Sequence, residues 1–277
     1  MGDDEKVLFN TPFYGQFAKT CQRNNKEYLA SPLIKNSDGS YDIDFIDLEE
    51  KMARDDVELF ILCNPHNPTG RDWKKEDLEK IADLGKKYDL WIISDEIHCD
   101  LRRKDAPRHI PLGKIMPSYN KLITSMAATK SFNIAGLAQS SIIIRSDQLK
   151  DRWMAEGAIG LNPLNHEASI AAYEKGVQWL SELNDYLDGN FKFLEKFLDK
   201  NLADVILSPA QTTYLAWLDF SEYFDEDDDL ELFFAKNAAV LVETDKTFVD
   251  HANRMLRINL ACPRSYLKEG LKRMAKV

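Results

Sequence analysis

Residues 59–70 read LFILCNPHNPTG, and residues 90–98 read LWIISDEIH. Each stretch is a continuous apolar run that ends in polar residues or prolines, which is typical of a buried parallel strand stopped by a breaker. Between the two runs, apolar residues recur at helical spacing among charged ones, and this pattern predicts a helix with one face on a sheet. They are Leu78, Ile81, Leu84 and Tyr88. Strand, helix and strand in this order form the βαβ unit of a parallel sheet, so we expect the α/β class.

The pattern extends on both sides of this unit. Further strands are expected at residues 7–9, 121–124 and 141–145. After residue 165 a long helical apolar repeat ends at Leu187, which predicts a bridging helix. A second set of elements follows, with helices at 191–202, 229–238 and 265–275 and strands at 214–219, 240–242 and 255–259. We therefore expect a large domain at residues 1–187 that ends in the bridging helix, and a smaller C-terminal α+β domain at residues 188–277.

Composition excludes several classes of protein. The 277 residues include 36 basic and 46 acidic side chains, and the net charge of −10 argues against a nucleic-acid partner. The apolar runs are far shorter than the roughly 20 residues that span a bilayer, so no membrane partner is expected. The acidic N-terminus does not resemble a signal peptide, which favours a cytoplasmic protein. Four scattered cysteines without a C-x-x-C pair predict reduced thiols and no metal site.

Polar residues follow three of the predicted strands. Asn67, Asp95 and Lys130 lie just after them, at the edge where open α/β sheets place their ligands. The glycine-rich signatures of dinucleotide-binding and P-loop proteins are absent. A lysine and a carboxylate in this position suit pyridoxal phosphate chemistry, because the amine forms an imine with the aldehyde and the carboxylate holds the pyridine nitrogen protonated.

Each of these residues also has an ordinary explanation. Asp95 could cap a helix, Lys130 could be a solvated charge, Asn67 could shape a turn before a proline, and His98 could be a structural histidine. The combination favours a site over four separate coincidences.

Four ordered motifs carry a resemblance to a known family. They are NPTG at 67–70, SDEIH at 94–98, TKSFNIAGL at 129–137, and RIN at 257–259 followed by ACPRS at 261–265. With them the chain resembles the fold-type-I pyridoxal phosphate-dependent enzymes of the aminotransferase class I/II superfamily. Within that superfamily it is most similar to the MalY/PatB-type carbon–sulfur lyases, which are related to cystathionine β-lyase and cystalysin. The resemblance covers nearly the whole chain.

The resemblance implies a role for each candidate residue. Lys130 would be the catalytic Schiff-base lysine and Asp95 the partner of the pyridinium nitrogen. The other cofactor contacts would come from Asn67 and His98 at the ring 3-oxygen, Tyr14 stacked on the ring, and Thr129 at the phosphate. Arg257 would hold the α-carboxylate of the substrate, a role that suits its planar pair of donors.

The resemblance also implies an activity. A small sulfur-containing amino acid of the cystathionine or cysteine type would be cleaved to a thiol, pyruvate and ammonia, by a homodimer that requires pyridoxal 5'-phosphate. Two alternatives stay open: an aminotransferase of the same fold, and a truncated, non-catalytic remnant with impaired cofactor binding.

Two departures from the family pattern accompany the resemblance. Relatives of this type begin well upstream, so the resemblance implies that the chain lacks an N-terminal segment with a phosphate-cradling turn. Near residues 243–249 the family tends to have a Gly before an aromatic–Gly pair, whereas residues 245–249 here read DKTFV. We therefore expect a differently shaped loop near the substrate.

Overall fold

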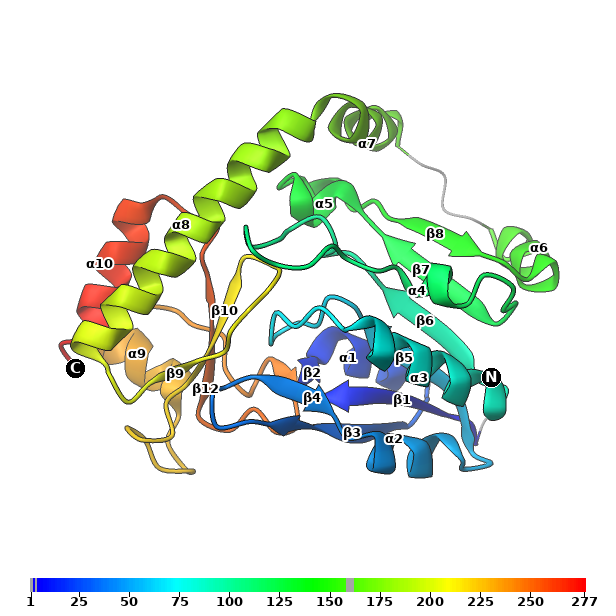
Figure 1. The fold of residues 1–277 in the computed structure, drawn as a ribbon, viewed down its shortest axis with the longest axis horizontal. Coiled ribbons are helices and arrows are strands. Elements are labelled where there is room, and N and C mark those ends of the chain that lie inside the picture. The colour runs from blue at the N-terminus through cyan, green and yellow to red at the C-terminus, as the bar shows by residue number, and fades with distance from the viewer. Residues whose placement is uncertain (1, 3, 158–161) are drawn as a thin grey trace.

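A computed structural model describes residues 2, 4–157 and 162–277 of the chain. At its centre lies a seven-stranded sheet in the order β4-β3-β1-β5-β6-β7-β8 (Figure 1). Strands β3, β1, β5, β6 and β7 are parallel to one another, whereas β4 and β8 pair antiparallel at the two edges. The strands are β1 (Lys6–Thr11), β3 (Tyr28–Lys35), β4 (Tyr41–Ile43), β5 (Val57–Cys63), β6 (Trp91–Asp95), β7 (Leu122–Met126) and β8 (Ser141–Ile144). The predicted mostly parallel sheet is confirmed.

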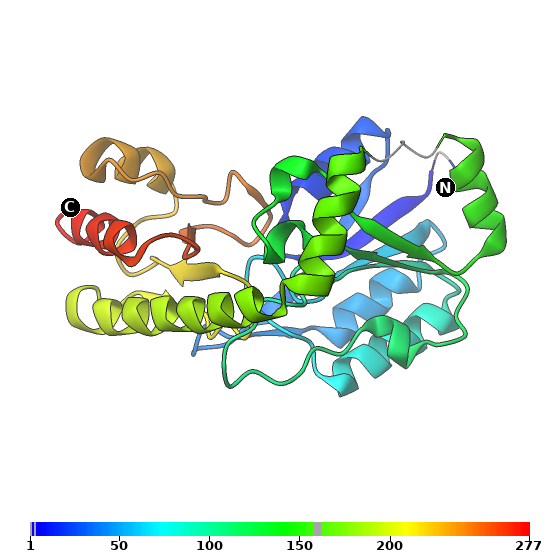
Figure 2. The same cartoon turned by 90° about the horizontal axis from the view of Figure 1, so that it is seen from above.

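The central strands bury side chains on both faces. Leu8 and Phe60 pack on the side of α2, α3 and α4, whereas Val7 and Ile61 point to the opposite side, where α1 lies (Figure 2). Successive strand residues point to opposite faces, so covering both faces requires apolar residues at consecutive positions. This explains the continuous apolar runs of the sequence. The helices are α1 (Gly15–Arg23), α2 (Phe45–Met52), α3 (Lys75–Lys87) and α4 (Leu112–Ile115).

Two helices lead out of the sheet, α7 (Pro163–Lys175) and α8 (Val177–Asn201). The helix is interrupted between them at Gly176. A Cβ atom at this position would lie 2.3 Å from the carbonyl oxygen of Ala172 and 2.3 Å from the ring of Phe132. The prediction of a helix ending at residue 187 and a separate one at 191–202 is wrong, because α8 runs through both without interruption. The proposed domain boundary at residue 187 therefore falls inside α8.

Beyond α8 the chain forms a second, antiparallel sheet in the order β12-β10-β9, seen with α9 and α10 on the left of Figure 2. These elements are β9 (Ile206–Leu207), β10 (Leu215–Asp219), α9 (Leu230–Ala238), β12 (Met255–Asn259) and α10 (Arg264–Met274). They share a core with the C-terminal half of α8, to which Phe191, Leu218 and Phe234 belong. Trp217 points instead into the main core, where its Nε1 donates a hydrogen bond to the Tyr41 hydroxyl at 3.1 Å.

The strand expected at residues 240–242 is wrong. Those three residues have no strand pairing, and the side chain of Leu241 is 85% exposed. The next residue, Glu243, instead forms an isolated antiparallel bridge with Arg257 of β12. The segment is apolar in composition, but apolar composition without a pairing partner does not make a strand.

The remaining short elements frame the end of the main sheet. A two-stranded pairing joins β2 to β11, and α5 and α6 flank β8 in the chain. Their bounds are β2 (Phe13–Tyr14), α5 (Ala128–Ser131), the 3₁₀ helix η1 (Ala135–Leu137), α6 (Asp147–Ala155) and β11 (Phe248–Val249). Among the described residues, no helix is both long and apolar enough to cross a membrane.

Candidate active site

A cavity of about 780 Å³ opens at the carboxyl ends of β5, β6 and β7. Six of the predicted site residues line it: Tyr14, Asn67, Asp95, His98, Lys130 and Arg257. The structure thus brings together residues that are up to 243 positions apart in the sequence. The seventh predicted residue, Thr129, is buried beside Lys130 in α5 and is not part of the cavity lining.

The topology explains why these side chains meet. Asn67 lies in the turn after β5, Asp95 is the last residue of β6, and Lys130 lies in α5 directly after β7. Because the three strands are parallel neighbours, their carboxyl ends lie at the same edge of the sheet. Arg257 approaches from β12 of the second sheet, and Tyr14 from β2.

The surroundings of the Asp95 carboxyl group disfavour its charged form. Burial is the main cause that raises its pKa to about 6, and the neighbouring Glu96 adds to the shift. The Ile97 backbone N–H, which donates to Asp95 Oδ1 at 3.2 Å, and the positive charge of Lys130 oppose it. A cationic N–H group placed against this carboxyl would therefore be stabilised.

His98 is a neutral imidazole at the wall of the cavity. Burial, together with the nearby charges of Lys130 and Arg257, lowers its pKa to about 3. Its ring meets that of Tyr214 edge-on at 5.9 Å. The Nδ1 atom is buried and has no hydrogen-bond partner among the described residues. Buried polar atoms rarely stay unpaired, so this nitrogen is suited to a ligand oxygen.

Hydrogen bonds and aromatic contacts hold the Arg257 side chain in place. Its Nη1 donates to Asn67 Oδ1 at 2.7 Å, and its Nε donates to Glu243 Oε2 at 2.7 Å. Its Nη2 also contacts Glu243 Oε2. The guanidinium carbon lies 4.8 Å from the centre of the Phe248 ring and 5.7 Å from that of Tyr14, at cation–π distance. Its side chain is only 8% exposed.

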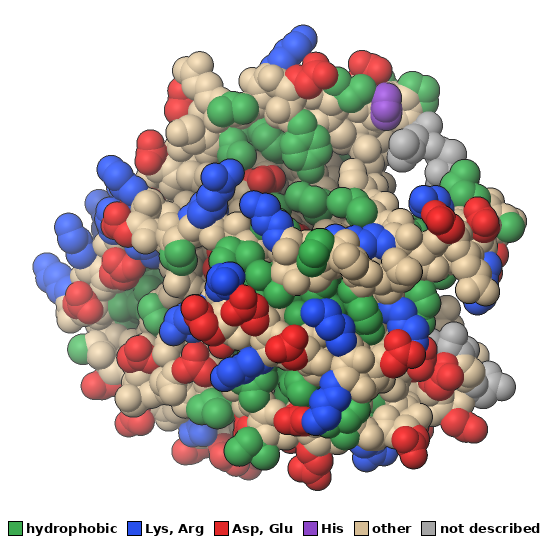
Figure 3. Space-filling view, turned by 45° about the vertical axis from the view of Figure 1, so that its right-hand side comes forward, with side chains coloured by type: hydrophobic (Ala, Val, Ile, Leu, Met, Phe, Trp, Pro, Cys, Tyr) green, Lys and Arg blue, Asp and Glu red, His purple; other side chains and the backbone are tan. Residues whose placement is uncertain are grey.

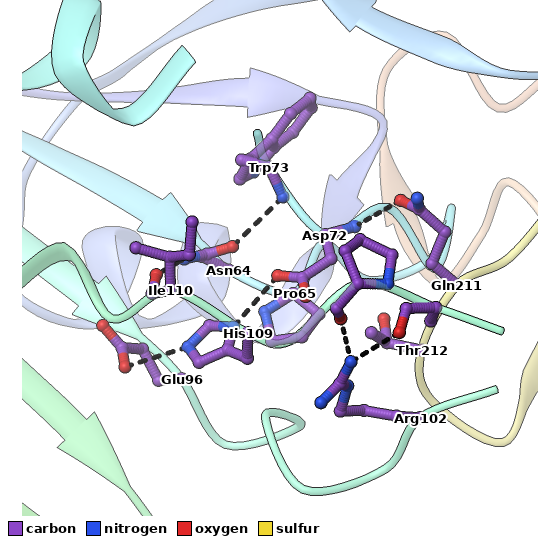
Figure 4. A network of polar contacts seen from close by, with 12 residues as sticks. Asn64, Pro65, Asp72, Trp73, Glu96, Arg102, His109, Ile110, Gln211 and Thr212 are labelled. Carbon is purple, nitrogen blue, oxygen red and sulfur yellow. Dashed lines mark hydrogen bonds and ion pairs between the residues drawn. The ribbon is translucent and has the colours of Figure 1, made fainter. Parts of the chain in front are cut away.

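A second polar network, drawn in Figure 4, includes Glu96, the residue after Asp95 in the chain. His109 Nδ1 lies 2.9 Å from Asp72 Oδ1, and its Nε2 lies 3.2 Å from Glu96 Oε2. Burial alone would lower the pKa of His109, but the two carboxylates raise it to about 9. The other Glu96 oxygen accepts from Ser94 Oγ at 2.8 Å and from the first backbone N–H of α4, at Leu112. The network ties the end of β6 to the start of α4.

Several residues of the cavity were missed by sequence reasoning. An apolar floor comes from alternate residues of β6, β7 and β8 and from α6, including Ile93, Ile123, Ile142, Ile144 and Trp153. Side chains two positions apart on a strand point to the same face, so Asp95 could have indicated Ile93 on β6, and Ser125 could have indicated Ile123 on β7. Tyr214 and Glu243 also line the cavity. The departure from the family pattern near residue 243 was the only sequence signal for Glu243.

The class of the protein follows from these features together with comparison to known proteins. The family model "Aminotransferase class I and II" matches residues 1–274, so the chain belongs to that family. It is 37% identical over 275 residues to "Cystathionine beta-lyase PatB" of Bacillus subtilis, covering 98% of this chain and 70% of that protein. It is 32% identical over 272 residues to "Protein MalY" of Escherichia coli, covering 96% and 69%.

Solved structures agree with the sequence relatives. The PLP-bound C-S lyase from Staphylococcus hominis is 44% identical, with a TM-score of 0.96 over 100% of this chain and 71% of that one. Cystalysin from Treponema denticola, whose structure contains a pyridoxal 5'-phosphate cofactor, is 31% identical, with a TM-score of 0.93 over 98% and 70%. The fold is therefore the fold-type-I architecture that the sequence resemblance implied.

Proposed function

We propose that the chain is a pyridoxal 5'-phosphate-dependent carbon–sulfur β-lyase, which eliminates a thiol from cystathionine- or cysteine-type amino acids and, after hydrolysis of the remaining aminoacrylate by one water, yields pyruvate and ammonia. One observation carries this proposal: a lysine, a partly buried carboxyl group and an arginine converge in one cavity of about 780 Å³. The relatives named above that combine high identity with nearly full coverage of this chain are cystathionine and C–S lyases.

The residues of the cavity fit the cofactor. Asp95 has a raised pKa and, within the described part of the chain, no ion-pair partner, which suits a protonated pyridine nitrogen. The unpaired Nδ1 of His98 suits the ring oxygen, with Asn67 on the same wall. Among the described residues no hydrogen bond or ion pair occupies the Lys130 amine, so it is available for the aldehyde. Tyr14 offers an aromatic face at the cavity wall. Thr129, expected at the phosphate, is buried beside Lys130 and does not line the cavity, so the proposal does not depend on it.

When bound, the cofactor supplies an aldehyde that joins the amino group of the substrate and a protonated ring that accepts the electron pair left on Cα. Lys130 then takes the proton from Cα with its Nζ atom and returns a proton to the leaving sulfur. Arg257 holds the α-carboxylate through charged hydrogen bonds and so orients the Cα–H bond toward Lys130. His98 remains neutral and donates or accepts a hydrogen bond without adding charge.

An absorbance titration tests the proposal. Purified protein is mixed with pyridoxal phosphate beside the Lys130→Ala variant, and then with cystathionine. We expect a visible absorbance band that requires Lys130, followed by pyruvate release that the variant lacks. Consumption of a keto-acid acceptor without pyruvate would make the protein an aminotransferase instead. Identical spectra for both proteins would make it a non-catalytic member of the family.

The remaining expectations are proposals of the same kind. We propose a homodimer that acts in the cytosol, and a division into a cofactor-binding part at residues 1–187 and a smaller part at 188–277. Support for the location comes from four free thiols, three of them buried. Support for the division comes from the separate core that α8 shares with the second sheet.

A further inference from the structure

The Glu243 side chain occupies the face of Arg257 that a carboxylate ligand would use. Its Oε2 accepts from Arg257 Nε at 2.7 Å and also contacts Nη2. These two donors form one edge of the guanidinium, the edge that binds carboxylates in a two-pronged way. One N–H of Nη1 donates to Asn67 Oδ1 at 2.7 Å. The Nε–Nη2 edge of Arg257 is therefore occupied while Glu243 stays in place.

The backbone holds Glu243 in this position. Arg257 N donates to Glu243 O at 2.8 Å, and Glu243 N donates to Arg257 O at 3.4 Å. Among the described residues, this isolated bridge is the only strand-like pairing made by residues 240–243. The following loop is anchored in turn, because Gly15 N donates to Thr247 O at 3.0 Å and β11 pairs with β2. The contact is thus fixed by two backbone attachments as well as by charge.

The carboxylate can nevertheless leave without a large penalty. The side chain of Glu243 is 48% exposed, whereas that of Arg257 is 8% exposed. Glu243 reaches water by a side-chain rotation, while Arg257 stays packed against Phe248 and Tyr14. An ion pair with one exposed partner is weak enough for a second carboxylate to displace it.

We propose that Glu243 is a built-in competitor for the α-carboxylate of the substrate and thereby sets the affinity of the site for anionic ligands. The inference rests on the proposed function, because it takes Arg257 as the carboxylate-binding residue. It concerns the same segment in which the sequence departs from the family pattern. To use the Nε–Nη2 edge, the substrate carboxylate replaces that of Glu243, and Glu243 then turns to water.

Binding of propionate, a carboxylate that cannot react, tests the competition directly. We expect Glu243→Gln to bind propionate about 5-fold more tightly than the parent protein, measured by saturation-transfer NMR both with and without added pyridoxal phosphate. Propionamide, which has no charge, should bind both proteins equally. The control is Glu269→Gln, which removes a comparable Glu–Arg pair on the surface of α10, where Glu269 Oε1 lies 2.9 Å from Arg273 Nε. Adding Arg257→Gln to Glu243→Gln should remove the gain.

Kinetics give a second readout. We expect Glu243→Gln to lower KM for cystathionine by about 5-fold with kcat within about 2-fold of the parent, because the competitor acts equally on ground-state and transition-state binding. Equal propionate affinity in the parent, Glu243→Gln and Glu269→Gln proteins, or weaker binding by Glu243→Gln, would overturn the inference. Should circular dichroism show that Glu243→Gln is unfolded, Glu243→Ala carries the same expectation.

The two proposals fail in different ways. If the chain is not a lyase, the Lys130-dependent absorbance or the pyruvate is missing, yet propionate still distinguishes Glu243→Gln from the parent. If only the competition is wrong, pyruvate is formed and the propionate affinities are equal.

Discussion

At the scale of single residues, the Asp95 carboxyl group of the site lowers the stability of the folded chain. Its pKa is raised to about 6 in the folded chain, above the value of about 3.9 expected when unfolded. The folded state thus disfavours the charged form, a cost that is present above pH 6 and disappears as the pH falls through 6 toward 4. Residues selected for chemistry commonly carry such a cost.

We therefore expect Asp95→Asn to stabilise the cofactor-free protein. The amide keeps an oxygen for the Ile97 N–H but carries no charge, so the free energy of unfolding at pH 8 should rise by about 2 kcal/mol. The gain should shrink at pH 5. Urea denaturation at both pH values measures it, with Asp83→Asn, an exposed position on α3, as the control. A variant that is less stable than the parent at pH 8 would contradict the explanation.

Sequence reasoning found the residues that belong to contiguous motifs at strand ends, such as Asn67, Asp95 and Lys130. It could not find contacts made by segments that arrive from elsewhere in the chain. Glu243 and Arg257, which form a β-bridge, are 14 positions apart in the sequence. His109 and Asp72 are 37 positions apart. Such pairs depend on tertiary placement, which periodicity and local motifs do not encode.

At the scale of elements, the connection from β6 to α4 depends on a buried charge network. His109 has a pKa of about 9 when folded, raised above the value of about 6.5 expected when unfolded. The folded state holds this proton more tightly, so its contribution to stability is complete below pH 6.5 and is lost as the pH rises through 9.

We expect His109→Ala to leave two buried carboxyl groups, those of Asp72 and Glu96, without their cation. The free energy of unfolding at pH 6 should fall by about 3 kcal/mol, and the difference should narrow at pH 10. Denaturation curves between these pH values test the sign. His166→Ala, at a half-exposed position on α7, is the matched control and should leave the pH profile unchanged. An equal loss at pH 6 and pH 10 would mean that packing, not charge, is what His109 supplies.

Strands with continuous apolar runs were the elements that the sequence revealed. Strands β1 and β5 to β8 all appeared as apolar runs close to their true positions. The parallel neighbour β3 was missed, because it includes Pro32 and most of its residues are partly or fully exposed. The apolar spacing predicts two separate helices on either side of Gly189, whereas helix α8 continues through this glycine. A glycine inside a helix weakens it without ending it.

At the scale of the whole molecule, one edge of the main sheet is open. The sheet ends at β8, whose outer edge has no strand beside it in the described ranges. Exposed apolar side chains lie on β8 and on the neighbouring α6, among them Ile143 at 53% and Met154 at 63%. Figure 3 brings this side of the molecule forward and shows hydrophobic side chains exposed among charged ones. An open edge with exposed apolar side chains is suited to contact with another chain.

The proposed homodimer can be tested at this edge. We expect light scattering after size exclusion to give twice the chain mass of 31.8 kDa, and Ile143→Lys to weaken dimerisation about 10-fold, because a charge would be buried without a partner. Added salt should strengthen the dimer, since each chain has a net charge of −10 and screening reduces their repulsion. Ile46→Lys, at an 83% exposed position on α2, makes the same substitution away from this edge and should leave the dimer intact. If Ile143→Lys and Ile46→Lys have the same mass as the parent at every concentration, β8 is not the contact.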